Sequence, residues 1–128
     1  MSVISSAAMI LAALALLFIC IAPNLIMKEL GEAMEPRLAS AISKALSEDV
    51  EAAYYDITEM KALVDERLCV LMMLFSHEDV MELTHALLAA EEISLTGDAS
   101  QLLAELTAAQ SELAFLKQAN EARAENLF

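Results

Sequence analysis

Residues 3–22 read VISSAAMILAALALLFICIA, and Ser5 and Ser6 are the only clearly polar side chains among them. The residues before Lys28 include no Asp, Glu, Lys, Arg or His. A helix of twenty residues is about 30 Å long, which matches the hydrocarbon thickness of a bilayer. The stretch therefore predicts a transmembrane anchor over residues 1–27 that contacts the lipid bilayer through residues 3–22.

A cleaved signal peptide and a buried core helix are the alternatives to a retained anchor. A signal peptide begins with a positively charged region and has a shorter apolar core, but no Lys or Arg precedes this run. The small-residue site at residues 20–22 is followed by Pro23, which is unfavourable after a cleavage point. A core helix usually carries a polar face. We therefore expect a retained, single-pass anchor in a cell membrane.

The charges that follow the anchor bear on its orientation. Lys28, Arg37 and Lys44 come after the span, and positive residues favour the cytoplasmic side. Long domains largely escape that rule, so an extracytoplasmic domain stays open. Cys20 lies in the span and Cys69 is the only other cysteine, so no disulfide within the domain is expected.

The rest of the chain is strongly acidic. The 128 residues include 20 acidic and 7 basic ones, for a net charge of −13. This balance excludes a basic nucleic-acid surface, so no nucleic acid is expected as a partner. Hydrophobic residues make up 59% of the chain, which is too many for a disordered protein. Only two Gly and two Pro occur, which favours helices over sheets with tight turns.

Residues 28–47 are expected to form a juxtamembrane helical stalk. Glu35 precedes a proline, which biases it away from helix, so we expect a break or kink near Pro36. Proline suits the first turn of a helix, and a new helix over residues 36–46 is predicted. Ser47 is the expected N-cap of the helix that follows.

Residues 48–128 are predicted to form an acidic helical bundle. Apolar residues at steps of three and four predict one helix over residues 50–75. Ser76 is expected to open the next helix. Gly97 is expected to adopt a left-handed conformation in the last turn, and Asp98 to cap the last helix. The stripes of the last two helices are Val80, Leu83, Leu87, Ala90, and then Leu102, Leu106, Ala109, Leu113 and Leu116.

The predicted fold class is all-α, with an N-terminal transmembrane helix followed by a small antiparallel three- to four-helix bundle. Each apolar stripe must be buried against another helix, and short connections make neighbouring helices antiparallel. A domain of about 100 residues has a modest core, and many core positions are Ala or Met, which specify packing weakly. Homo-oligomerisation is one expected consequence.

Three segments resemble a small uncharacterised family of membrane-anchored helical proteins from Gram-positive, clostridia-type bacteria. They are the acidic helix start EDVEAA at 48–53, the helix start FSHED at 75–79, and the ending NLF at 126–128. The resemblance covers the whole chain, although the aromatic Trp position of the family is absent. It implies a bacterial cell-membrane protein with its bundle outside the cytoplasm, and it implies no biochemical activity.

Metal ligation has three weak candidates. Glu78, Glu82 and His85 share one helix face at steps of four and three. A Glu-x-x-His pair can bind metal in a bundle core, but a second such pair is needed and is missing here. A helix start at His77 favours capping or packing for that residue. No metal site is therefore predicted.

A soft-metal site and an active site are two further alternatives. Copper would require Cys69 to converge with methionines such as Met72 and Met73, but core packing is the simpler interpretation of these methionines. No nucleophile–base order, Gly-rich phosphate loop or CxxC motif occurs. We therefore expect no enzyme activity, no catalytic residue and no cofactor.

Two classes of function remain. The first is an interaction or structural protein that presents an acidic bundle to an unidentified protein partner at the bacterial cell membrane. The second is an extracytoplasmic, sensor-like module that binds a small ligand between its helices. The acidic surface would be repelled by an anionic bilayer, so the bundle is expected to stand off the membrane on its stalk.

Overall fold

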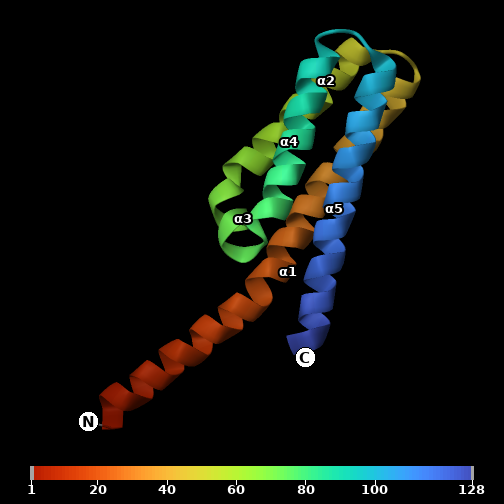
Figure 1. Ribbon diagram of the computed structural model, residues 1–128. Coiled ribbons are helices and arrows are strands. Elements are labelled where there is room, and N and C mark those ends of the chain that lie inside the picture. Colours follow the sequence, from red (N-terminus) through yellow and green to blue (C-terminus); the bar gives the residue numbers. More distant parts are fainter. Residues whose placement is uncertain (1, 128) are drawn as a thin grey trace.

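The computed structural model describes residues 2–127, so Met1 and Phe128, the ends of the predicted anchor and bundle, lie outside it. The described residues form five helices and no strand (Figure 1). They are α1 (Ser2–Leu46), α2 (Val50–Glu66), α3 (Leu68–Leu74), α4 (His77–Ser94) and α5 (Ala99–Leu127). The predicted all-α fold, a long apolar N-terminal helix followed by a helical bundle, is confirmed.

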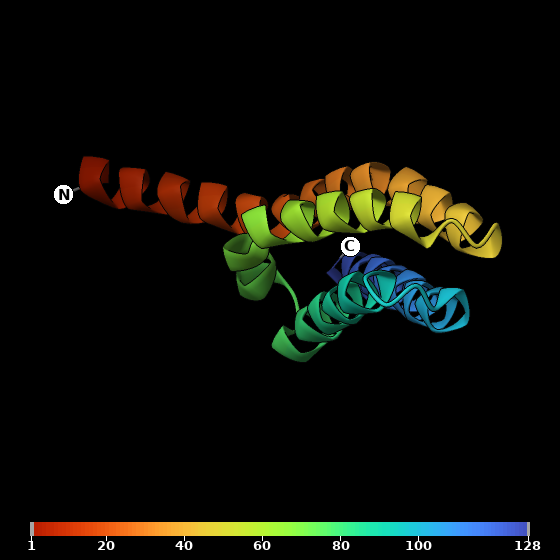
Figure 2. The same cartoon turned by 90° about the horizontal axis from the view of Figure 1, so that it is seen from above.

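The four long helices form a closed antiparallel bundle. α1 packs against α2 and α5, and α4 packs against the same two helices. Seen from above, the pair α1 and α2 forms one layer and the pair α4 and α5 forms the other (Figure 2). The bundle thus has four long helices, the upper end of the predicted range, because the second half of α1 is one of them.

The predicted break near Pro36 is wrong, since α1 is one helix of 45 residues that contains both prolines. An internal proline costs a helix about 3 kcal/mol. Met34 and Leu38, on either side of Pro36, are fully buried against the bundle, and burial of such a side chain contributes about 1.5–3 kcal/mol. Packing on both sides therefore outweighs the proline.

Residues 28–46 consequently do not form a separate stalk or a separate helix from residue 36. They are the first helix of the bundle. Their buried residues are Leu30, Gly31, Met34, Leu38, Ala41 and Ala45.

The α1–α2 turn has a different cap from the predicted one. Asp49, not Ser47, is the N-cap of α2, and its Oδ1 accepts from the backbone N–H of Ala52 at 3.3 Å. The Ser47 hydroxyl instead donates to the Ser43 carbonyl at 3.0 Å, at the end of α1. Glu48 has a φ of 62°, and this left-handed residue reverses the chain within three residues.

The predicted continuous helix over residues 50–75 is also wrong, because it is interrupted at Arg67. The Arg67 backbone has φ −104° and ψ 5°, and its N–H donates to the Val64 carbonyl at 3.1 Å, a tighter turn than an α-helix makes. The apolar seam nevertheless continues, since Val64 and Leu71 on the two sides are both buried. The interruption reorients α3 so that α4 can return along the bundle.

The second half of the chain follows the prediction closely. Ser76 occupies the N-cap position of α4, although its side chain makes no capping hydrogen bond. Gly97 has a φ of 82°, as expected for a left-handed residue. Asp98 caps α5, since its Oδ1 accepts from the Gln101 N–H at 3.1 Å. Every residue of the two stripes predicted for these helices is buried.

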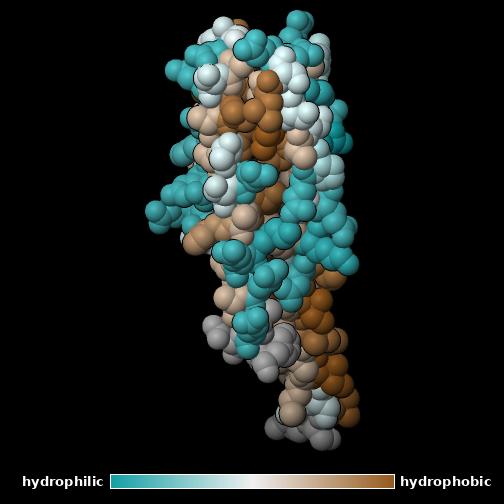
Figure 3. Space-filling model, turned by 90° about the vertical axis from the view of Figure 1, so that its right-hand side faces the viewer, coloured by the Kyte–Doolittle hydropathy of each residue, from teal (hydrophilic) through white to brown (hydrophobic). Residues whose placement is uncertain are grey.

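The N-terminal part of α1 projects beyond the bundle. Residues 3–19 are all exposed, and Ala22 is the first buried residue of the helix. The projection forms a brown, apolar extension at the lower end of the molecule (Figure 3). Among the described residues, α1 alone is long and apolar enough to cross a membrane. This geometry is consistent with a membrane anchor.

Candidate functional site

Ion pairs join the helices around most of the bundle. Five of the seven basic side chains pair with a carboxylate on another helix or across a helix junction, as far as the described residues show. The pairs are Arg37–Glu59, Lys44–Asp56 and Arg67–Glu29 between the α1 and α2 segments, Lys61–Glu91 between α2 and α4, and Lys117–Glu35 between α5 and α1. Lys and Arg side chains thus form ion pairs at three of the four contacts between the long helices.

The contact between α4 and α5 is the acidic one. α4 contains no Lys or Arg, and α5 contains none before Lys117. Glu82 of α4 and Glu105 and Glu112 of α5 line a shallow groove between the two helices, together with His85. We call these four residues and Asp79 the α4/α5 acidic face.

Within this face, Glu112 is the residue whose pKa is shifted. Burial raises the pKa of its carboxyl above the ordinary value, and a hydrogen bond with Glu82 and the negative charges of Glu82 and Asp79 raise it further. A negatively charged neighbour makes ionisation of a carboxyl group less favourable, so Glu112 takes up a proton at a higher pH than an isolated Glu does. A cation beside Glu112 would lower this pKa again, because a positive charge favours the ionised carboxyl group.

The structure brings together only part of the predicted metal set. Glu82 and His85 line the same groove, whereas Glu78 is exposed one turn earlier on α4. Within residues 2–127, no three His, Cys, Asp or Glu side chains are close enough to hold a metal ion. Glu82 and His85 therefore contribute polar and charged groups to the surface of this groove.

Sequence reasoning missed Glu105 and Glu112 because they belong to a different helix from Glu82. The signal was present in the turn at Gly97. In an antiparallel hairpin, positions equally distant from the turn lie side by side, and residues 82 and 112 are both fifteen positions from residue 97. Pairing the two helices about Gly97 would have placed the two carboxylates together.

The sulfur residues considered for copper do not form a pocket in the core. Cys69 is exposed, and Met73 is 82% exposed. Met72 is half-buried and packs against the core. His77, the first residue of α4, is exposed as well.

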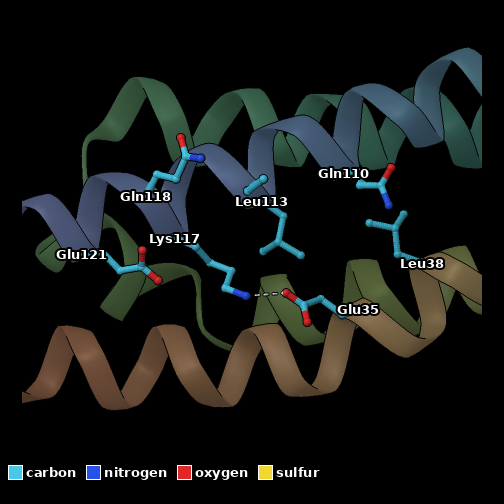
Figure 4. A pocket seen from close by; sticks show the side chains of 8 residues that line it. Glu35, Leu38, Gln110, Leu113, Lys117, Gln118 and Glu121 are labelled. Atoms are coloured by element: carbon cyan, nitrogen blue, oxygen red, sulfur yellow. Dashed lines mark hydrogen bonds and ion pairs between the residues drawn. The ribbon is translucent and has the colours of Figure 1, made fainter.

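A second, more polar groove lies between α1 and α5 and has a volume of about 490 Å³. Lys117 Nζ and Glu35 Oε1 are 2.6 Å apart across it, and the aliphatic Leu38 and Leu113 form its apolar part (Figure 4). The hydrogen bond and charge of Glu35 raise the pKa of Lys117, against the lowering effect of burial. The other lining residues are Gln110, Ala114, Gln118 and Glu121.

Comparisons of the chain with protein-family models, with curated proteins and with solved structures give no match. The resemblance to the clostridial membrane-anchored family therefore stays a prediction. The class that the fold itself defines is a helical bundle continuous with one potential membrane-spanning helix.

Proposed function

We propose that this protein is a single-pass, membrane-anchored helical bundle whose role is binding rather than catalysis. Residues 3–22 hold it in a bacterial cell membrane, and the α4/α5 acidic face receives a basic segment of a protein partner. The observation that supports this proposal is the uneven placement of charge. Five of the seven bases pair at the other helix contacts, whereas the acidic residues of the α4/α5 groove have, among the described residues, only His85 beside them as a basic side chain.

The electrostatics of this face suit a basic partner. A groove lined by one sign of charge attracts the opposite charge and speeds association, and salt screens the attraction. Because the pKa of Glu112 is raised, a Lys or Arg placed beside it would bind its ionised form more strongly than its protonated form. Binding should therefore strengthen as pH rises through the raised pKa and weaken as salt increases.

The sidedness of the bundle belongs to the same proposal. The resemblance to the clostridial family implies an extracytoplasmic bundle, whereas Lys28, Arg37 and Lys44 favour the opposite orientation. We propose the extracytoplasmic orientation. Protease added to intact spheroplasts should digest the bundle, and digestion only after lysis would establish a cytoplasmic bundle.

Photo-crosslinking in native membranes tests the binding role. A photoreactive residue at Ala108, in the acidic groove, should capture a basic protein, and capture should fall as ionic strength rises from about 0.05 to 0.5 M. The same residue at Thr58 on α2 is the positional control.

A matched pair of variants separates the acidic face from total charge. Replacing Glu82, Glu105 and Glu112 with Gln should abolish the crosslink. A control with the same charge change outside the face, Glu32→Gln, Glu51→Gln and Asp65→Asn, should retain it. Equal loss in both variants, or capture that does not respond to salt, would contradict the proposal.

A small-ligand-binding role is the second candidate, and the α1/α5 groove favours it. The groove has a volume of about 490 Å³ and contains one ammonium and one carboxylate that already pair. A zwitterionic ligand could exchange partners with Lys117 and Glu35. A fragment screen by NMR on the full chain, with Lys117→Met as the control, would test it, and hits unaffected by this substitution would exclude the groove.

A further inference from the structure

α3 has an apolar face that the bundle leaves uncovered. Residues 68–75 read LCVLMMLF, eight successive apolar residues in an otherwise acidic domain. Leu71 is buried, whereas Met73 is 82% exposed, Val70 is 41% exposed and Cys69 is exposed. Steps of three and four place Cys69, Val70 and Met73 on one side of the helix. We call these three residues the α3 apolar face.

This face lies where α1 leaves the bundle. In both views, α3 is at the end of the bundle from which the N-terminal part of α1 projects (Figures 1 and 2). One side chain shows more closely where α3 lies along α1. Arg123 of α5 donates from Nη1 to the Leu74 carbonyl at 2.9 Å and from Nη2 to the Ile19 carbonyl at 3.4 Å.

A single guanidinium group therefore joins the C-terminal end of α3 to the apolar stretch of α1. Ile19 lies within residues 3–22, near the end of that stretch. If residues 3–22 span a bilayer, the end of α3 and Arg123 stand at the boundary between hydrocarbon and headgroups.

We propose that α3 is a second membrane contact, with the α3 apolar face inserted into the interfacial layer of the bilayer that α1 spans. The inference depends on the proposed anchorage of residues 3–22. Apolar side chains of a surface helix gain free energy by burial at this depth. Arg123 contacts both Leu74 of α3 and Ile19 of the anchor, which places α3 beside the lipid-facing stretch and favours lipid over a second protein.

Arg123 suits the same boundary. Among the described residues, no carboxylate lies within ion-pair distance of its guanidinium group, and both of its hydrogen-bond partners are backbone carbonyls. An arginine at this level can reach a lipid phosphate. The bundle then rests on the bilayer instead of standing off it, and the contact opposes the repulsion between the acidic domain and anionic lipids.

Site-directed fluorescence on the full chain in phosphatidylcholine vesicles tests this proposal. The Cys20→Ala variant leaves Cys69 as the only thiol, for an environment-sensitive dye. In a background without either native cysteine, Met9→Cys reports the span and Ser100→Cys reports the far end of the bundle. Lipids spin-labelled near the headgroup or deep in the acyl chain then quench each dye according to its depth.

We expect strong shallow quenching at residue 69, deep quenching at residue 9 and none at residue 100. Adding Met73→Glu should lower the quenching at residue 69 several-fold without loss of helical circular dichroism, because Met73 is exposed. Leu95→Glu, which changes a residue 72% exposed at the other end of the bundle, should have no effect.

The outcomes distinguish the α3 contact from the membrane anchor. Quenching at residue 9 without quenching at residue 69 would overturn the α3 contact and leave the anchor intact. No quenching at residue 9 would remove the anchor and the α3 contact together. A blue-shifted but unquenched dye at residue 69 would show that protein, a second copy or a partner, covers the face, and would also overturn the proposal.

Discussion

Replacing each of the two glycines with alanine should change stability in opposite directions. Gly31 is buried within α1, where its backbone is helical. Alanine is favoured over glycine in a helix interior by about 0.5–1 kcal/mol. A Cβ at this position would lie 3.7 Å from Glu35 Oε1 and 3.8 Å from Lys117 Cδ, which are ordinary contacts. Gly31→Ala should therefore raise the free energy of unfolding by about 0.5–1 kcal/mol.

At Gly97 the same substitution meets a different backbone. No atom lies within 4 Å of the added Cβ, so crowding contributes nothing. The φ of 82° is the whole cost, and a left-handed conformation costs an L-residue about 1–2 kcal/mol. Alanine also restricts the unfolded chain, which offsets part of this cost. Gly97→Ala should lower the free energy of unfolding by about 1 kcal/mol.

Thermal unfolding of the full chain in detergent micelles, followed by far-UV circular dichroism, measures both effects. For a domain of about 100 residues, 1 kcal/mol corresponds to about 4–8 °C in Tm. The two variants should fall on opposite sides of the native protein. A lower Tm for Gly31→Ala would mean that α1 is not continuous at this residue or that α5 lies closer. An unchanged Tm for Gly97→Ala would place the turn elsewhere.

Three further predictions concern single side chains, and a fourth concerns the anchor. Glu112→Gln should raise Tm at pH 7 and have little effect near pH 4. The reason is that the raised pKa of Glu112 makes the native protein gain stability as pH falls through that pKa. Thermal melts across this pH range measure the effect, and equal changes in Tm at both ends would refute it. Asp98→Ala should lower the free energy of unfolding by about 1 kcal/mol in denaturant titrations, since it removes the α5 cap. Asn120→Ala should lower it by a similar amount, because the buried Asn120 amide donates to Asn24 Oδ1 at 2.7 Å; a double-mutant cycle with Asn24→Ala would show no coupling if the bond contributes nothing. Intact mass of the protein in membranes should correspond to a chain that retains residues 3–22, and a chain beginning near Pro23 would identify a signal peptide.

The parts of the fold that local chemistry decides could be read from the sequence. The stripe of α4, the stripe of α5 and the turn at Gly97 all follow from spacing and from the conformations that Gly and Asp allow. The path through Pro36 and the interruption at Arg67 could not. In both places the local preference is overruled by packing with helices distant in sequence, which a single helix pattern does not contain.

The candidate site was accessible only in part for the same reason. Glu82 and His85 were singled out on one helix, but the pKa of Glu112 depends on a neighbour thirty residues away in the chain. The absence of bases from α4 is visible in the sequence. That the carboxylates of the α4/α5 groove lack a Lys or Arg partner among the described residues becomes clear only when the ion pairs at the other helix contacts are known.

The continuity of α1 also determines which way the bundle faces. One uninterrupted helix joins the apolar projection to the buried core residues that begin at Ala22. Each residue of a helix turns its successor by about 100°, so the number of residues between the projection and the core sets the rotational position of the bundle about the anchor. A single alanine inserted after Leu17, before the first residue of α1 that contacts the bundle, would leave the composition of the buried core unchanged. It would nevertheless rotate α3 and the acidic groove by about 100° about the axis of the anchor helix.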